Sequence, residues 1–303
     1  MSALTSLRDA LAVASFHVRR ARRTRTLLAL CVVYVIAAGG VAWIFRTVVH
    51  HMEKAAADVL RVPQTDTPGA MIDTLRTQDE FRRMMEGLIP DPQLLDWAMG
   101  LPVLTVSHFW MALGLLPFLA AAAGSEVLAP SVHDRSLRFE LVRTGRLELV
   151  YGRWLGQAAL VALATTLSVV GPLFIGEVFM VEQPFGQTLQ VLVGMTPPLV
   201  AWTLPFLGLG VATSQLTANT NFARILALLG VTTTWVFYGL TFSERIKEKA
   251  PWAIDLISPL LPQSYMADLW GPGAGWLTSG GILLGLGLAF ALLGYPRFAR
   301  RNV

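Results

Sequence analysis

The sequence predicts an all-α polytopic membrane protein with six transmembrane helices, an N-terminal amphipathic interfacial helix and a helical extracytoplasmic loop. The first observation is composition: 54% of the 303 residues are hydrophobic and 15% are charged, with a mean hydropathy of +0.54. Soluble globular chains carry roughly 25% charged residues. The second observation is six long runs without Lys, Arg, Asp or Glu. We therefore expect the whole chain, residues 1–303, to form one transmembrane domain.

The first 26 residues predict a helix on the cytoplasmic membrane surface. Apolar residues recur there at helical steps of three and four, at Leu4, Leu7, Leu11, Ala14 and Val18, and five arginines follow between residues 19 and 25. Such a pattern suits anionic headgroups. A signal peptide is the alternative, but the next apolar run, Leu27–Phe45, is longer than the 7–15 residues typical of one. At 1.5 Å per residue it spans about 28 Å, which is enough to cross the hydrocarbon.

Five further runs predict the remaining spans, at Trp97–Gly124, Trp154–Gly176, Gln187–Thr213, Ile225–Phe242 and Gly275–Pro296. A charge at the centre of a spanning helix costs about 2.5–3.5 kcal/mol, so its absence favours spanning and disfavours a charge-relay carrier. Three prolines in the fourth run predict a kink or local unwinding. In the sixth, Gly280, Gly281, Gly285 and Gly287 suit close helix packing, and Gly281 and Gly285 form a small-residue pattern. We expect packing within the chain rather than a dimer motif.

The distribution of charge predicts that both termini are cytoplasmic. With six spans, the amino end, the second and fourth loops and the carboxyl end share one side. That side holds 15 of the 24 Lys and Arg but only five of the 20 Asp and Glu. The positive-inside rule places this side in the cytoplasm, here expected at a bacterial inner membrane. Topology thus accounts for the pI near 9.6, and no nucleic-acid partner is expected.

Two segments are expected outside the membrane on the other side. Residues 46–96 predict a small helical cap with helices at Met52–Val62 and Thr77–Leu88, the second opened by a capping box. Residues 243–274 contain an apolar stretch, Ala253–Leu261, that is too short to cross and predicts a re-entrant or interfacial piece. A soft metal could bind His50, His51 and Met52 with Met84 and Met85 in the cap, but interfacial packing is favoured, so we predict no metal site.

The loop between the second and third spans, residues 125–153, is the strongest candidate for a functional surface. It carries five arginines and four acids, and apolar residues recur among them near helical spacing at Leu137, Leu141, Leu147 and Val150. This pattern predicts an amphipathic connector that faces a soluble partner. A loop that only contacts lipid headgroups is the alternative, and the four acids disfavour it because anionic lipid repels them.

Motifs in this loop resemble those of the type-2 ABC transporter permease family. The second span ends in Gly124-Ser125-Glu126, and Asp134-Arg135-Ser136-Leu137 follows. The turn Arg143-Thr144-Gly145-Arg146 then leads to Gly152-Arg153 at the start of the third span. The SPLLPQSY segment before the last span is also similar. Two departures are the replacement of the usual Gly-Glu-Arg-Glu by residues 129–133 and the missing glycine after Asp134.

The resemblance implies a permease subunit whose coupling helix docks in a groove of a cytoplasmic ABC ATPase. We call residues 125–153 the coupling region. The candidate contacts are Glu126, Arg135, Arg138, Phe139, Glu140, Arg143 and Arg146. The resemblance also implies a second permease copy or a related chain as partner, contact with membrane lipids, and ATP and Mg²⁺ held by the ATPase rather than by this chain.

The sequence lacks the motifs of a self-sufficient enzyme. It contains no phosphate-binding G-x-x-x-x-G-K-[ST] loop, no H-E-x-x-H and no G-x-S-x-G, so we expect neither catalysis nor a cofactor in this chain. The leading hypothesis is an ATP-driven exporter. The alternative is a membrane anchor that uses the ATPase to act mechanically on an extracytoplasmic protein through residues 46–96. The substrate cannot be read from these residues, and lone His108 is expected to be an interhelical hydrogen-bonding group.

Overall fold

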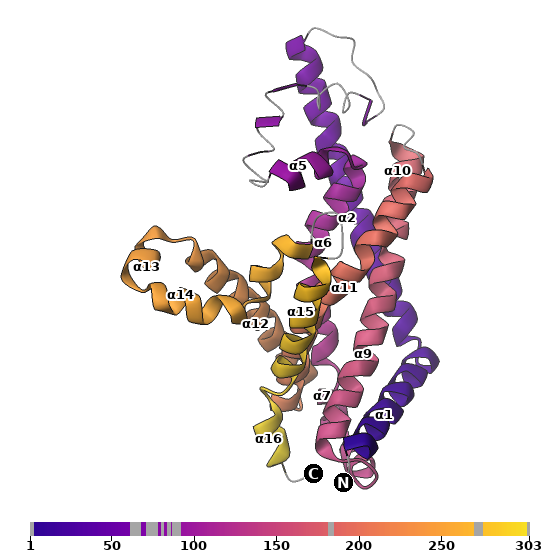
Figure 1. The fold of residues 1–303 in the computed structure, drawn as a ribbon. Helices are drawn as coiled ribbons and strands as arrows, with labels where there is room; N and C mark the ends of the chain where they lie inside the picture. The colour runs from indigo at the N-terminus through magenta and orange to yellow at the C-terminus, as the bar shows by residue number, and fades with distance from the viewer. Residues whose placement is uncertain are drawn as a thin grey trace.

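The computed structural model describes residues 3–60, 68–70, 78–79, 82–83, 86, 92–180, 185–269 and 275–301. The described part is a bundle of helices whose two chain ends lie at the same end of the molecule (Figure 1). Six helical segments are long and apolar enough to cross a membrane, as predicted: Thr26–Ala55, Leu104–His133, Arg146–Phe179, Phe185–Leu216, Thr220–Thr241 and Trp276–Ala299. The protein is therefore a multi-pass membrane protein.

The described helices are divided between the two halves of the chain. The first half contains α1 (Ala3–Arg23), α2 (Thr26–Leu60), α5 (Pro92–Met99), α6 (Val103–Ser125), α7 (Ala129–His133), α8 (Leu137–Leu141), α9 (Arg146–Ser168) and α10 (Val170–Phe179). The second half contains α11 (Phe185–Leu216), α12 (Thr220–Thr241), α13 (Glu244–Lys249), α14 (Pro251–Ile257), α15 (Trp276–Ala291) and α16 (Tyr295–Ala299). Three short 3₁₀ turns, Ser258–Leu260, Pro262–Tyr265 and Ala267–Leu269, follow α14.

Helix α11 lies at the centre of the bundle and packs against α6, α9, α12 and α15. Its Trp202 and Phe206 side chains are fully buried, and the Trp202 indole donates a hydrogen bond to the Leu113 carbonyl of α6 at 3.0 Å. The chain stays α-helical through all three prolines of α11, so the predicted local unwinding is wrong. Surrounding helices enclose this helix and hold its backbone in place.

Glycines permit the closest helix contacts. A Cβ on Gly124 of α6 would lie 2.5 Å from the Leu207 carbonyl oxygen of α11, and one on Gly287 of α15 would lie 2.7 Å from the Leu204 oxygen. By contrast, a Cβ on Gly281 or Gly285 would meet nothing within 4 Å. The predicted close packing within the chain is therefore confirmed at Gly287 but not at Gly281 or Gly285, because α15 turns the Gly287 face toward α11.

Helix α2 is longer than the predicted first span. Its 35 residues extend about 52 Å, roughly 20 Å more than the hydrocarbon thickness. The Arg46 side chain marks where it leaves the apolar zone: its Nε donates to the Phe179 carbonyl at 3.2 Å, and its guanidinium lies 4.8 Å from the Trp43 ring centroid. As far as Leu60, the predicted helix at Met52–Val62 is thus the distal end of α2, because charged residues outside the membrane need not end a helix. The rest of it lies outside the described residues.

The remaining external segments are only partly described. The predicted helix at Thr77–Leu88 falls largely outside the described residues. In the second external segment, α13 and α14 form a short hairpin that projects sideways from the bundle (Figure 1). The exposed Trp252, Leu256 and Leu260 side chains of this segment suit a membrane interface. Neither helix is long enough to cross the hydrocarbon.

Helix α1 lies against α9 near the end of the molecule that carries both termini (Figure 1). A Cβ on Gly152 of α9 would lie 2.5 Å from the Ala10 carbonyl oxygen, and one on Gly156 would lie 2.9 Å from the His17 Cβ. The predicted apolar face of α1 points elsewhere, since Leu7 and Leu11 are each more than half exposed. Helix α1 therefore has a packed face and a separate apolar face that is free to meet lipid.

Candidate functional site

The coupling region folds as two single-turn helices rather than as one amphipathic helix. After α6 the chain forms α7, reverses at Asp134-Arg135, forms α8 and enters α9 at Arg146. Arg135 has φ 56°, in the left-handed region that glycine adopts at least cost. This chain forms the turn with an arginine in that conformation. Of the predicted apolar positions, Leu137 and Leu141 lie on α8, whereas Leu147 and Val150 lie on α9, after the turn at residues 142–145.

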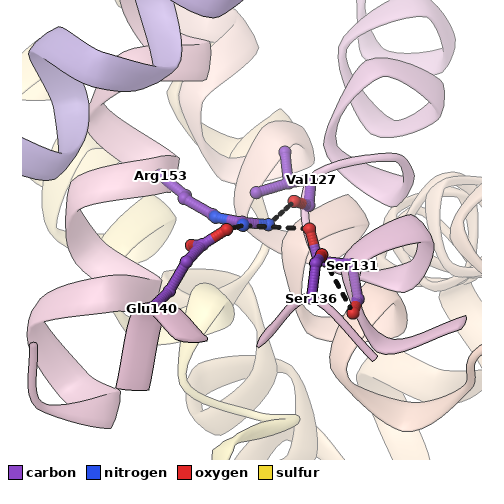
Figure 2. Close-up of polar contacts among 5 residues, drawn as sticks. All are labelled: Val127, Ser131, Ser136, Glu140 and Arg153. Carbon is purple, nitrogen blue, oxygen red and sulfur yellow. Dashed lines mark hydrogen bonds and ion pairs between the residues drawn. The ribbon is translucent and has the colours of Figure 1, made fainter. Parts of the chain in front are cut away.

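A buried arginine joins the parts of the coupling region (Figure 2). Arg153, in the second turn of α9, is 5% exposed. Its Nη2 lies 2.6 and 2.7 Å from the two carboxylate oxygens of Glu140 on α8 and 2.9 Å from the Ser131 hydroxyl of α7. Its Nη1 donates to the Val127 carbonyl at 2.5 Å. One guanidinium thus contacts α7, α8 and the chain that follows α6.

This arrangement fixes the geometry of the coupling region more than it adds stability. Burying an ion pair costs desolvation energy that its attraction offsets only when further hydrogen bonds satisfy both groups. Arg153 meets this condition through Val127 and Ser131 as well as Glu140. The planar guanidinium also imposes directions on its partners. Glu140, one of the predicted contacts, takes part in this ion pair, and its side chain is 26% exposed.

Five of the predicted contacts lie on the surface: Glu126, and four residues on α8 and its flanking turns. Arg135, Arg138, Phe139 and Arg143 are all exposed. The Phe139 ring is 66% exposed, and the Arg138 guanidinium lies 4.9 Å from its centroid. Beside them Val142 is 84% exposed, which is unusual for an aliphatic side chain. These four residues and Val142 form a surface that we call the exposed cluster.

The last two predicted contacts hold the coupling region to other helices. Glu126 forms an ion pair with Arg224 and so ties the end of α6 to the start of α12. Arg146 Nη1 donates to the carbonyls of Phe298 and Ala299 at 2.7 Å and of Arg301 at 3.1 Å. Arg146 therefore satisfies the free carbonyls at the end of α16, the ordinary role of a cation at a helix C-terminus.

A cavity of about 760 Å³ separates the coupling region from α1. Apolar groups from both sides line it, including Phe16 of α1 and Phe139 and Val142 of the exposed cluster. Arg20 and Arg143 add positive charge to its wall. The cavity thus offers apolar contact area together with fixed charges, the combination by which one protein surface accepts a helix of another.

His17 lies in the wall of this cavity and titrates abnormally. Burial lowers its pKa below the ordinary value, and the nearby Arg153 and Arg20 charges act in the same direction. A hydrogen bond between its Nε2 and the Gln157 side chain at 2.9 Å, and the Glu140 charge, oppose the shift only in part. His17 is therefore neutral at physiological pH while α1 is packed on α9.

The sequence pattern missed Arg153, Val142 and the α1 wall of the cavity as functional elements. The pair Gly152-Arg153 belonged to the motif that resembles the permease family, but only the fold shows that Arg153 points inward to Glu140. The four-residue spacing of Gly152 and Gly156 could have indicated a packed helix at that face. No sequence signal identifies α1 as its partner.

The described residues contain no group of three His, Cys, Asp or Glu side chains able to hold a metal ion. His50 and His51 have ring centroids 6.4 Å apart, and Met84 and Met85 lie outside the described residues. Cys31 is the sole cysteine and lies in α2.

Comparison with known proteins covers almost the entire chain. A protein-family model described as "ABC-2 family transporter protein" matches residues 11–303. The match includes α1 from Leu11 onward, the coupling region and all six spanning segments. No curated protein matches the chain.

Proposed function

Since this chain belongs to the ABC-2 family of transporter proteins, we propose that it is the permease subunit of an ATP-driven exporter in a bacterial inner membrane. In this proposal both termini are cytoplasmic, a separate ABC ATPase docks on the coupling region, and a second copy or a related chain completes the membrane pathway. ATP and Mg²⁺ bind the ATPase, because this chain has no phosphate-binding loop of its own.

The observation that carries the proposal is that the exposed cluster lies beside a buried ion pair, which joins α8 to α9. Phe139 and Val142 are largely exposed and border the cavity against α1, which suits an apolar face of a partner helix. Arg138 and Arg143 flank them and favour acidic residues on that partner. The Arg153–Glu140 pair stands directly behind. Movement of the ATPase against the exposed cluster would therefore move α9 with it as a rigid body.

Contacts at the edges of the coupling region support transmission to other spans. Arg224 of α12 pairs with Glu126, and Arg146 binds the carbonyls at the end of α16. Movement of the coupling region would thus reach α6, α12 and the last span together. We propose that the ATP cycle opens and closes the pathway through these links.

Co-purification with the ATPase tests the docking surface. The two proteins should be co-expressed and the membrane chain captured from mild detergent. We expect Arg138→Glu combined with Phe139→Ala to reduce the captured ATPase at least tenfold, because one change reverses charge and the other removes an aromatic anchor. The matched control is Arg300→Glu, an exposed arginine outside the exposed cluster, which should retain the ATPase. Equal capture by both variants would refute the docking surface.

A second function is favoured by the length of α2. Its distal end projects about 20 Å beyond the hydrocarbon, far enough to contact an extracytoplasmic protein. The chain would then act as a mechanical transmitter rather than as an exporter. ATP-dependent movement of a lipid-like substrate in proteoliposomes supports export. ATP hydrolysis without flux, combined with an ATP-dependent change in an extracytoplasmic partner, supports the transmitter.

A further inference from the structure

A narrow slot of about 20 Å³ lies between α2, α6 and α9 in the membrane-spanning part of the protein. Most of its wall is apolar, with Ala38 and Val41 from α2 and Leu115 from α6. Three polar residues interrupt this wall: Tyr34 of α2, His108 of α6 and Ser168 of α9. The slot thus brings polar groups from three helices to one place in a region surrounded by hydrocarbon.

Two of these polar groups are buried without a protein partner. Tyr34 is 1% exposed and His108 is 5% exposed. Within the described residues, neither the Tyr34 hydroxyl nor the His108 Nε2 has a hydrogen-bond partner. The Ser168 hydroxyl already donates to the Thr165 carbonyl at 2.7 Å. Buried polar groups in proteins are nearly always paired with protein or with ordered water, because leaving them unpaired is costly.

We propose that this slot binds one water molecule, which bridges the Tyr34 hydroxyl and His108 Nε2. A single water needs about 10–15 Å³, and the slot offers about 20 Å³. Tyr34 and His108 both line the slot and supply the two unpaired polar atoms. Water can accept from one group and donate to the other, so it satisfies both whichever tautomer His108 adopts. Because the volume admits only an oxygen-sized group, a metabolite or an acyl chain does not fit.

Other roles for the slot fit less well. No Asp, Glu, Lys or Arg lines it, so His108 has no charged neighbour with which to relay protons. Two polar side chains do not make a metal site, and no described cluster of three metal-ligating residues exists. The bridge instead adds a water-mediated polar contact to the direct packing of α2 on α6.

The stability of the Tyr34→Phe variant tests the water directly. If the hydroxyl binds water, its loss removes the bridge and leaves His108 Nε2 without a stable hydrogen-bond partner. The Tm should then fall by about 2–4 °C. His108→Leu should produce a similar fall, and the double variant should fall no further than either single one. If the slot is dry, Tyr34→Phe removes an unpaired hydroxyl, and the Tm should stay constant or rise. That result would overturn the proposal.

The control Tyr151→Phe alters a half-buried tyrosine outside the slot and should leave the Tm unchanged.

Water-edited solid-state NMR of the full-length protein in lipid bilayers identifies the source of the bound oxygen. Magnetisation that starts on water protons should reach the His108 imidazole, and Tyr34→Phe should abolish this transfer. Transfer only from lipid protons would show that a lipid hydroxyl or ester group occupies the slot and would overturn the proposal. Absence of transfer from either source would do the same.

Discussion

At the scale of single residues, Arg153 and Glu140 decide whether the coupling region keeps its shape. Arg153 is buried and depends on Glu140 for charge compensation, whereas the Glu140 side chain still reaches water in part. Loss of one partner should therefore destabilise the protein more than loss of the other. The loss of Glu140 would leave a cation buried, but the loss of Arg153 would leave an anion that solvent can reach.

We predict that Glu140→Gln destabilises the protein by about 3–5 kcal/mol, the usual cost of an uncompensated buried charge. Arg153→Met should cost less for the reason just given. The double variant should be more stable than Glu140→Gln alone, because it removes both charges. Thermal unfolding of the purified variants measures all three. Simple additivity of the two single effects would contradict the pairing.

His17 gives the packing of α1 a defined pH dependence. Released from α9, the imidazole titrates near its ordinary pKa of about 6.5, but burial lowers the pKa when α1 is packed. The released state therefore binds more protons as the pH falls. The stabilisation is complete above about pH 6.5 and is lost progressively below that value.

We predict that α1 becomes more accessible to protease between pH 7.5 and pH 5. His17→Gln keeps a polar side chain but does not titrate, so this variant should lose most of the difference. Limited proteolysis at each pH, followed by mass spectrometry, measures the release. Identical pH profiles for the two proteins would exclude His17 as the cause.

Part of the candidate site was predictable from the sequence. Charge and position were enough to locate Arg135, Arg138, Phe139 and Arg143 on the surface. They could not separate these residues from Glu140, because a surface carboxylate and one that compensates a buried arginine look the same in sequence. The distinction depends on Arg153, thirteen residues later, which only the folded chain brings to Glu140.

At the scale of elements, close packing of α1 on α9 depends on the absence of a side chain at Gly152. A Cβ there would lie 2.5 Å from the Ala10 carbonyl oxygen and 2.6 Å from the Val13 Cβ. The Ala10 oxygen is a backbone atom of α1, and the backbone of α1 also fixes the position of the Val13 Cβ. Neither atom can move away by side-chain rotation. Helix α1 would have to move outward, and the cavity that it shares with the exposed cluster would change shape.

We predict that Gly152→Ala destabilises the protein by about 1–3 kcal/mol, as overpacking of a close contact does. Gly281→Ala is the matched control, since its Cβ would meet nothing within 4 Å. That change should be neutral or stabilising by up to about 1 kcal/mol, because alanine is the better helix former. Thermal shifts of both variants measure the difference. Equal losses at the two positions would refute close packing at Gly152.

The helices themselves were largely predictable. Six charge-free runs located six spans, since a bilayer leaves few alternatives to a helix. Helix ends were less predictable: α2 continues to Leu60 because polar residues outside the membrane do not stop a helix. The division of the coupling region into α7 and α8 also escaped prediction, because an arginine rarely adopts the left-handed φ that Arg135 has.

At the scale of the whole molecule, the described contacts form one connected path from the exposed cluster to four spans. The path runs through Glu140 and Arg153 to α9, through Glu126 to α6 and α12, and through Arg146 to the segment after α15. The Glu126–Arg224 and Arg146–Phe298 links join elements that are far apart in the sequence. The fold therefore supports the proposal that one cytoplasmic event moves several spans together.

Site-specific photo-crosslinking from Phe139 tests this account most directly. A photoreactive amino acid at position 139 should crosslink, in intact cells, to a protein that carries a phosphate-binding loop. The same group at Leu229, an exposed residue of the spanning helix α12, should not capture that protein. Loss of the ATPase crosslink in Glu140→Gln would further tie docking to the Arg153 support. Crosslinks from position 139 to lipid alone, with the ATPase present in the same cells, would contradict the account.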